Sequence, residues 1–201
     1  MKDMIKGVLV IFLITLVAGA LLGVVYQVTK EPIRIQKEIA AQKADQAAFP
    51  GAEFEDYEGF DKTAADAVIS MNPSWSGVSI DSVRVAEVGG TRAGYVLQIT
   101  SKGYGDDITW KLGIGDDGTV NGISLISIAE TPGLGMNAGK VLVPQFDDVA
   151  IPDPMFTVVK TDDDLPETVN AISGATITTR AITNGVNAGL VYYEQVLKEV
   201  K

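Results

Sequence analysis

The sequence predicts an α+β protein, in which an antiparallel sheet meander with packed helices follows one N-terminal transmembrane helix. Three features of the 201-residue chain predict this class. An uncharged apolar run occupies residues 7–29, four short segments of alternating pattern lie within residues 82–127, and an amphipathic pattern closes the chain. Strands grouped together with helices before and after them are typical of an α+β domain.

The apolar run from Gly7 to Thr29 lies between Lys6 and Lys30. As a helix it would be roughly 34 Å long, enough to cross a hydrocarbon core of about 30 Å. A buried core helix and a cleaved signal peptide are the alternatives, and Ala18-Gly19-Ala20 matches the small-residue cleavage pattern. Cleavage there would leave an apolar N-terminus, so we expect residues 1–30 to be kept as a membrane anchor.

The segment after the anchor, residues 31–50, is expected to be a connecting helix. Arg34 to Phe49 is rich in helix-forming residues, and Pro50-Gly51 ends the pattern. The rest of the chain, residues 51–201, is the expected folded domain. From position 50 onward the chain carries 22 of the 26 acids and 10 of the 16 bases, which gives a net charge of −12. Such a charge is typical of a solvated domain and not of a second membrane element.

Four runs rich in Val, Ile, Thr and aromatic residues predict the strands of the meander. They are SVRVAEV (82–88), YVLQITS (95–101), ITWKLGI (108–114) and TVNGISLIS (119–127). The segments between them are rich in glycine, and Asp116-Asp117-Gly118 is the clearest hairpin turn.

A glycine-rich loop from Glu130 to Gly139 and a stretch with four prolines follow. The last helix is expected from about Thr176 to Lys198. Its apolar side is expected to face the sheet through Ile177, Ala181, Val186, Leu190 and Leu197.

Composition excludes several classes of chemistry. The chain has no His and no Cys, so it contains no Ser-His-Asp or Cys-His nucleophile, no zinc site with His or Cys ligands, no thiolate-held cluster and no disulfide. No catalytic or metal-binding residue is therefore proposed. A net charge of −10 also argues against a nucleic-acid partner, because affinity for the backbone comes from Lys and Arg.

Two glycine-rich segments do not support a nucleotide-binding loop of a common type. Gly133 to Ala138 fits G-x-G-x-x-A, but Pro132 precedes it and the βαβ context is missing. Gly139-Lys140 does not complete a P-loop, because Leu134 stands at the first glycine position and Val141 at the Ser/Thr position. By its spacing alone, Gly103-Tyr104-Gly105 predicts a turn between strands.

The segment from Ala171 to Arg180 is a better candidate, because it places small residues and hydroxyls where a loop becomes a helix. Ser173 or Thr176 can serve as the N-cap, and the free N–H groups of the first turn suit a phosphate. An ordinary capped helix with no ligand is the alternative that the composition alone favours.

Three motifs resemble FMN-binding domains. Ser173-Gly174-Ala175-Thr176-Ile177-Thr178 matches the S/T-G-A-S/T-x-S/T flavinylation motif, whose last hydroxyl is esterified to the FMN phosphate. Gly103-Tyr104-Gly105 resembles the start of the G-Y-G-G-x-I segment, and residues 130–135 match E-T-P-G-L-G. With one N-terminal span, the chain resembles the G subunit of the Rnf electron-transport complex. The C subunit of the sodium-translocating NADH:quinone oxidoreductase, which tends to be longer, is the nearest alternative.

The resemblance implies that residues 51–201 are an FMN-binding domain that carries FMN as a phosphoester on Thr178. A separate flavin transferase would attach it from FAD and would supply the base and the metal. The chain would then be the acceptor of the flavin and would not be catalytic on its own. Thr179 is the weaker candidate acceptor. The resemblance also implies cofactor contacts from the segment around Thr178 and from the second loop: Ser173, Gly174, Ala175, Thr176, Glu130, Thr131 and Leu134. Some family members have a His where Ile128 stands here.

The same resemblance implies electron relay within an ion-translocating ferredoxin:NAD oxidoreductase, with the other membrane subunits as partners. It places the protein as a single-pass protein of the bacterial inner membrane with its domain on the outer side. The basic residues Lys30, Arg34, Lys37 and Lys43 follow the span, and by count they favour the opposite orientation. The competing hypothesis is a cofactor-free, membrane-anchored binding module. Trp75 and Trp110 are expected in the core and not beside a flavin.

Overall fold

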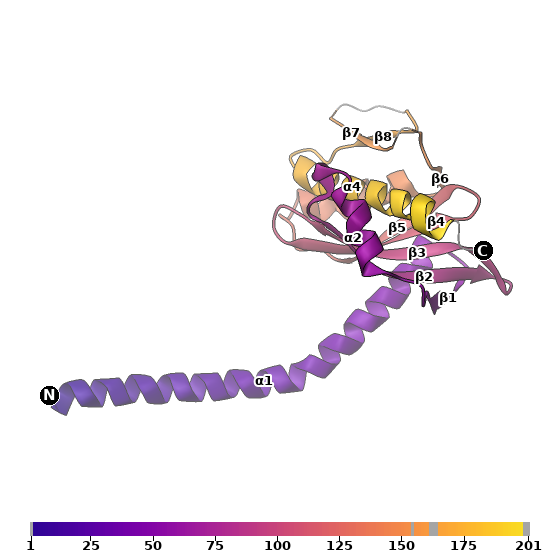
Figure 1. Cartoon of the computed structure of the whole chain (residues 1–201). Coiled ribbons are helices and arrows are strands. Elements are labelled where there is room, and N and C mark those ends of the chain that lie inside the picture. The colour runs from indigo at the N-terminus through magenta and orange to yellow at the C-terminus, as the bar shows by residue number, and fades with distance from the viewer. Residues whose placement is uncertain (1, 154, 161–164, 199–201) are drawn as a thin grey trace. The chain divides into compact units, whose positions relative to one another are not determined.

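The computed structural model describes residues 2–153, 155–160 and 165–198 (Figure 1). The chain divides into two compact units, residues 1–40 and residues 41–201. Helix α1 (Lys2–Ala48) begins in the first unit and ends in the second. The expected anchor and the expected connecting helix are therefore parts of one continuous helix, which ends just before Pro50.

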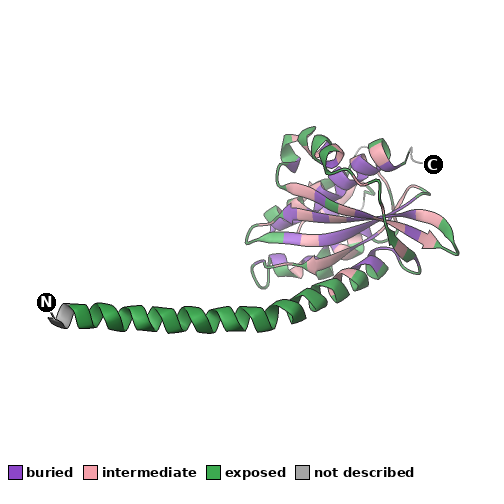
Figure 2. Cartoon of the chain, turned by 60° about the horizontal axis from the view of Figure 1, so that its bottom comes forward, coloured by how far each residue is buried: buried purple, intermediate pink, exposed green. Residues whose placement is uncertain are grey.

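Among the described residues, helix α1 is long and apolar enough to cross a membrane, by length and composition alone. The mean hydropathy of its most apolar 18-residue window is 3.0. Side chains are exposed throughout residues 5–39 (Figure 2). The helix continues through Pro32, although this residue has no N–H to donate. Ion pairs from Arg34 to Glu31 and Glu38, one turn away on either side, support the helix around this position.

The second unit is built on a six-stranded antiparallel sheet in the order β1-β2-β3-β4-β5-β6, which confirms the predicted α+β class (Figure 1). The four predicted strands are its central meander, and each is present at the predicted place. The strands are β1 (Glu53–Asp56), β2 (Val78–Val88), β3 (Thr91–Lys102), β4 (Asp107–Gly115), β5 (Thr119–Ser127) and β6 (Val149–Ala150).

The turns of the meander have the backbone that their sequences predict. Gly89 and Gly90 both have positive φ, 62° and 77°, which suits a two-residue hairpin between β2 and β3. In the Asp116-Asp117-Gly118 turn, Gly118 has a φ of 86° and the Asp117 carboxylate accepts a hydrogen bond from the N–H of Thr119 at 3.1 Å. These turns fix the register of the strands that they connect.

Helices α2 (Lys62–Ser70) and α4 (Thr176–Tyr192) pack against one face of the sheet. A π-helical turn (Tyr193–Leu197) extends α4. Gly185 and Gly189 allow α4 to approach β4 closely, because a Cβ at these positions would lie 2.6 Å from Trp110 and 2.7 Å from Leu112. The remaining helical pieces are short: η1 (Pro73–Trp75), η2 (Gly135–Asn137), α3 (Ala138–Val141) and η3 (Val143–Phe146).

The predicted apolar side of the last helix is partly wrong. Val186, Leu190 and Leu197 are buried as expected, but Ile177 is 54% exposed. The buried side instead includes Thr178 and Ile182. At 3.6 residues per turn Ile177 lies on the opposite side of the helix from Val186, and the buried side continues into the first turn through Ile182 and Thr178. Trp75 and Trp110 both lie in the core, as predicted.

The opposite face of the sheet is covered by the end of α1 and the segment that follows it. Ala48, Phe49 and Ala52 form a small cluster there with Ala86 and Val96. The fit is tight, because a Cβ on Gly113 of β4 would overlap the carbonyl oxygen of Ala48. Strand β4 is therefore buried on both faces. A short parallel pair, β7 (Thr157–Val159) and β8 (Thr168–Asn170), lies in the proline-containing stretch.

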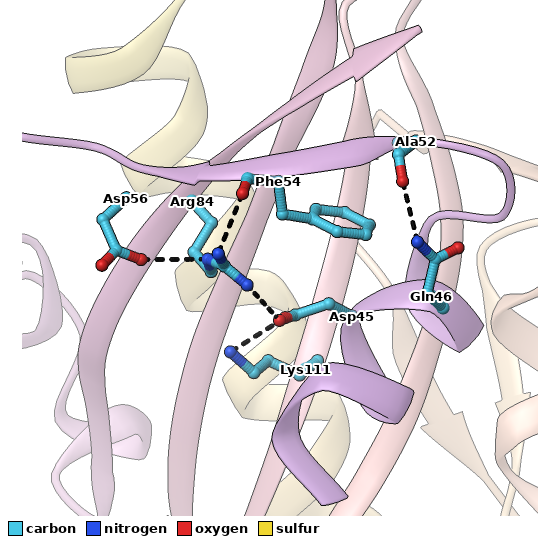
Figure 3. Close-up of polar contacts among 7 residues, drawn as sticks. All are labelled: Asp45, Gln46, Ala52, Phe54, Asp56, Arg84 and Lys111. Atoms are coloured by element: carbon cyan, nitrogen blue, oxygen red, sulfur yellow. Dashed lines mark hydrogen bonds and ion pairs between the residues drawn. The ribbon is translucent and has the colours of Figure 1, made fainter. Parts of the chain in front are cut away.

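A buried ion network holds the end of α1 on this face (Figure 3). The Asp45 carboxylate faces Lys111 Nζ at 2.9 Å and Arg84 Nη1 at 2.7 Å. Asp45 and Lys111 are almost fully buried, with side-chain exposures of 2% and 3%. Arg84 also donates to the Phe54 carbonyl at 2.9 Å and to the exposed Asp56 carboxylate at 3.0 Å. Because each buried charge faces an opposite charge, the network is costly to break on one side only.

We expect Asp45→Ala to lower the free energy of unfolding by about 3–5 kcal/mol, because it leaves the buried Lys111 ammonium without its carboxylate. The matched control is Asp56→Ala, which removes a 91% exposed carboxylate from the same Arg84 and should cost less than about 1 kcal/mol. Urea unfolding of the full chain in detergent measures both. Equal losses for the two variants would contradict the proposed role of burial.

Candidate functional site

A cavity of about 560 Å³ lies at the N-terminal end of α4. Three segments that are distant in the sequence form its wall: the β3–β4 loop, the loop after β5, and the first turn of α4 with the residues before it. The lining residues are Tyr104, Thr131, Leu134, Gly135, Gly174, Ala175, Thr176, Ile177 and Thr178. The volume lies within the range of about 300–1,000 Å³ that is typical of small-molecule sites.

The Glu130 carboxylate joins these three segments. Its Oε1 accepts hydrogen bonds from the backbone N–H groups of Tyr104 and Gly105 at 2.8 and 3.1 Å. Its Oε2 accepts a hydrogen bond from the Thr178 hydroxyl at 2.8 Å. Glu130 is 7% exposed and Thr178 is 1% exposed. A buried carboxylate needs such donors, since leaving it without them would be expensive.

Two glycines make room for this carboxylate. A Cβ on Gly135 would lie 2.7 Å from both Glu130 Oε2 and Thr178 Oγ1, and a Cβ on Gly103 would overlap Glu130 Oε1. Gly174 lines the cavity in the segment that precedes α4. Its φ of 75° turns the chain into α4, and its Cα faces the Leu134 side chain, which a Cβ would approach to 2.9 Å.

The first turn of α4 is not capped by a side chain. The predicted N-cap, Ser173 or Thr176, is wrong, because Ala175 occupies the N-cap position and the helix starts at Thr176. Within the described part of the chain, the backbone N–H groups of Thr176, Ile177 and Thr178 have no acceptor. These N–H groups and the positive end of the helix dipole suit an anionic ligand.

The structure brings most of the predicted site residues together. Thr131, Leu134, Gly174, Ala175, Thr176 and Thr178 all line the cavity. Ser173 does not line it, and neither does Glu130, which lies behind the wall and holds it by hydrogen bonds. The sequence offered no signal for Ile177 as a lining residue, because its apolar side chain suited a buried helix face.

Thr179, the alternative acceptor, has its hydroxyl turned away from the cavity. It donates to the Ala175 carbonyl at 3.0 Å and accepts from the Ile172 N–H at 3.1 Å. Among the residues that the structure describes, no group of three carboxylate, His or Cys side chains is placed to hold a metal ion.

A smaller cavity of about 320 Å³ adjoins the first, and Ile177 lines both. Lys102 and Arg180 are on its wall, together with Ser101 and Asn184. In an acidic chain, two basic side chains on the wall of this second cavity favour an anion there.

A helix N-terminus with free N–H groups beside a partly apolar cavity suits a ligand that has a phosphate and an apolar part. In agreement with this, residues 103–191 match the FMN-binding domain family. The match includes all three segments that form the cavity.

Relatives from ion-translocating complexes match nearly the whole chain. The G subunit of the Na⁺-translocating ferredoxin:NAD⁺ oxidoreductase complex of Acetobacterium woodii is 28% identical over 98% of this chain and 95% of its own length. The G subunit of the proton-translocating complex of Clostridium ljungdahlii is 32% identical over 85% of this chain and 80% of its own. The chain therefore belongs to the Rnf-type family of G subunits of ion-translocating oxidoreductase complexes. Together, the family and the apolar helix indicate a membrane-anchored protein.

A crystal structure, that of Shewanella oneidensis NqrC, is also similar, with a TM-score of 0.46 and 20% sequence identity over 64% of this chain and 67% of that one.

We expect Gly135→Ala to destabilise the domain by about 1–3 kcal/mol, because the added methyl group would overlap both partners of the Glu130–Thr178 hydrogen bond. The matched control is Gly139→Ala, whose Cβ would meet only Leu125 at an ordinary 3.7 Å. Thermal unfolding followed by circular dichroism measures both. A Gly135→Ala protein that melts with the control would show that this close contact can relax at no cost.

Proposed function

We propose that this chain is the flavin-carrying subunit that transfers electrons within an ion-translocating ferredoxin:NAD oxidoreductase complex. FMN is joined to it by a phosphoester on Oγ1 of Thr178. The observation that carries the proposal is the position of Thr178, a residue of the cavity wall in the first turn of α4. The family match supports the cofactor, and the names of the relatives support the complex.

The residues around the cavity suit each part of FMN. The N–H groups of Thr176, Ile177 and Thr178 are available for the phosphate, and Gly174 has no side chain to obstruct it. Tyr104 and Leu134 present partly exposed apolar surface, 70% and 40% exposed, that a flavin ring would cover. Thr131 and Ala175 complete the walls, whereas Glu130 holds Thr178 and does not contact the ring.

When bound, FMN supplies the redox chemistry. The protein's own residues hold it in place. The ester to Thr178 prevents its loss, and the walls limit the orientation of the ring. Covalent attachment suits a domain on the outer side of the membrane, where a lost cofactor could not be replaced from the cytoplasm.

Maturation and assembly follow from the same proposal. A separate flavin transferase attaches FMN from FAD, and the other membrane subunits of the complex are the partners that exchange electrons with the domain. Helix α1 crosses the bacterial cell membrane once. The basic residues after the span do not prevent export, because a domain of this size is translocated largely regardless of local charge. One relative is named for Na⁺ and another for protons, so the proposal covers the electron path and not the ion.

Thr178→Val should abolish covalent flavin, because it replaces the acceptor hydroxyl by a methyl group of similar size. Each variant is produced together with a flavin transferase, and a denaturing gel is viewed under ultraviolet light. Thr178→Ser keeps a hydroxyl and should remain fluorescent, and so should Thr179→Val, because the Thr179 hydroxyl faces the Ala175 carbonyl. A dark band for the unmutated chain would refute the proposal, and peptide mapping would identify the modified residue.

Gly174→Val should strongly reduce flavin loading even though the Thr178 hydroxyl remains. The side chain would strain a backbone with φ of 75° and would collide with Leu134 at the cavity wall. Gly118→Val is the matched control, because it has the same type of backbone, φ 86°, with open space around it in the β4–β5 turn. Intact-mass measurement gives the loaded fraction. Equal loading in the two variants would contradict the need for close approach at Gly174.

A further inference from the structure

We infer that Glu130 accepts the proton of the Thr178 hydroxyl when the flavin is attached, so that the acceptor chain supplies the base of its own modification. The inference rests on the proposed function, because it concerns the reaction that places FMN on Thr178. It assigns to Glu130 a chemical role in place of the cofactor contact expected from the sequence, and it replaces the expectation that the transferase supplies the base.

The geometry is that of a base already in contact with its nucleophile. Thr178 has one hydroxyl hydrogen, which it donates to Glu130 Oε2, and the distance from Oγ1 to Oε2 is 2.8 Å. A candidate base must lie within such hydrogen-bond reach of the proton that it takes. With its hydrogen committed to the carboxylate, Oγ1 keeps its lone pairs for the phosphorus atom that it must attack. Among the described residues, no other acceptor bonds to this hydroxyl.

The carboxylate is held in position from its other end. The N–H groups of Tyr104 and Gly105 fix Oε1, and the absence of a side chain at Gly135 lets Oε2 reach Thr178. Hydrogen bonds from backbone N–H groups to a carboxylate are strong. Glu130 therefore cannot turn away from the hydroxyl without losing two further hydrogen bonds. This preorganisation fits a residue that must be aligned before the transferase arrives.

The balanced reaction has three parts. Thr178 Oγ1 forms a bond to the FMN phosphorus of FAD, and the bond from that phosphorus to the bridging oxygen breaks. The electron pair of the broken bond leaves with AMP. The proton from Oγ1 moves to Glu130 Oε2. No oxidant or reductant is needed, and FAD, held by the transferase, is the only other reactant.

The product state supports the same assignment. Once Oγ1 is an ester oxygen, it has no hydrogen to donate, and an ionised Glu130 would face it and the charged phosphate in a buried place. Such an arrangement is costly. A Glu130 that has taken the proton can instead donate a hydrogen bond to Oγ1. The contact between the two side chains is then kept before and after the reaction, with donor and acceptor exchanged.

The test is the Glu130→Gln variant of the full chain in detergent, with purified flavin transferase and FAD. The amide oxygen of Gln can still accept from Tyr104 and Gly105, but Gln cannot take the proton. We expect kcat for flavin transfer to fall by about 100-fold or more, the size typical of a lost general base. The KM for the chain should be unchanged, since the surface offered to the transferase is the same. Intact mass gives the rate of incorporation.

The control for the loss of one negative charge is Glu55→Gln, an exposed position on β1, which should be labelled at the unmutated rate. Glu130→Asp restores a carboxylate on a side chain one methylene shorter. We expect its kcat to be at least about tenfold higher than that of Glu130→Gln. The melting temperature shows whether the Gln variant is folded. If it is not, the kcat of Glu130→Asp tests the role of the carboxylate.

The outcomes separate the two proposals. If the unmutated chain takes no flavin, the proposed function fails. If the unmutated chain is labelled and folded Glu130→Gln is labelled at the same kcat, the role of Glu130 as a base is overturned and the proposed function stands. A rise in KM with kcat unchanged, or a Glu130→Asp variant with no recovery, would also overturn it.

Discussion

The site depends on one buried carboxylate that receives three hydrogen bonds. Glu130 bonds to residues 26 and 25 positions before it, at Tyr104 and Gly105, and to Thr178, 48 positions after it. Two loops and a helix terminus would otherwise be separate pieces of surface. Because an unsatisfied carboxylate is expensive in a buried place, these segments are held together whenever the domain is folded. This explains why the motifs have glycine at positions 103 and 135, because a side chain at either position would occupy the space of the carboxylate.

The sheet explains how the site is supported. Trp110 and Leu112 of β4 point into the main core beneath α4, while Lys111 and Gly113 point to the opposite face beneath the end of α1. A strand that is covered on both faces has little freedom to shift. The loop before β4 contains Tyr104 and Gly105, and α4 begins beside the cavity, so two of the three wall segments extend from rigid elements. Binding groups on such elements keep their geometry better than groups on free loops.

Much of this fold could be predicted from the sequence, because the signals are local. Alternation and turn glycines located β2 to β5, and uninterrupted hydrophobicity located the apolar part of α1. The face occupied by Lys111 could not be predicted in this way. A lysine within ITWKLGI is expected on a solvated face, and only the end of α1, more than 60 residues earlier, provides the covering surface and the Asp45 partner. The two-residue strand β6 is similarly visible only through its pairing with β5.

The motif predicted where the site is but not the role of each residue within it. The sequence indicated that Glu130 belongs near the cofactor. A sequence motif does not distinguish a residue that lines the cavity from one that holds the lining residues by hydrogen bonds. Ser173 matches the motif and lies outside the cavity lining, whereas Ile177 is its variable position and lines it. Which side chains face inward is decided by the turn at Gly174 and by the start of α4 at Thr176, and both depend on the packing of the helix against the sheet.

The absence of histidine gives the carboxylate its importance. Making an ester from a hydroxyl releases one proton, and in most proteins an imidazole would be the natural group to take it. This chain has none. Among the side chains that contact the Thr178 hydroxyl in the described structure, Glu130 alone can accept a proton and later return it as a hydrogen bond to the ester oxygen. The interaction that assembles the three segments is thus also the one suited to the chemistry of loading, which makes a correctly folded domain the form that is ready for its cofactor.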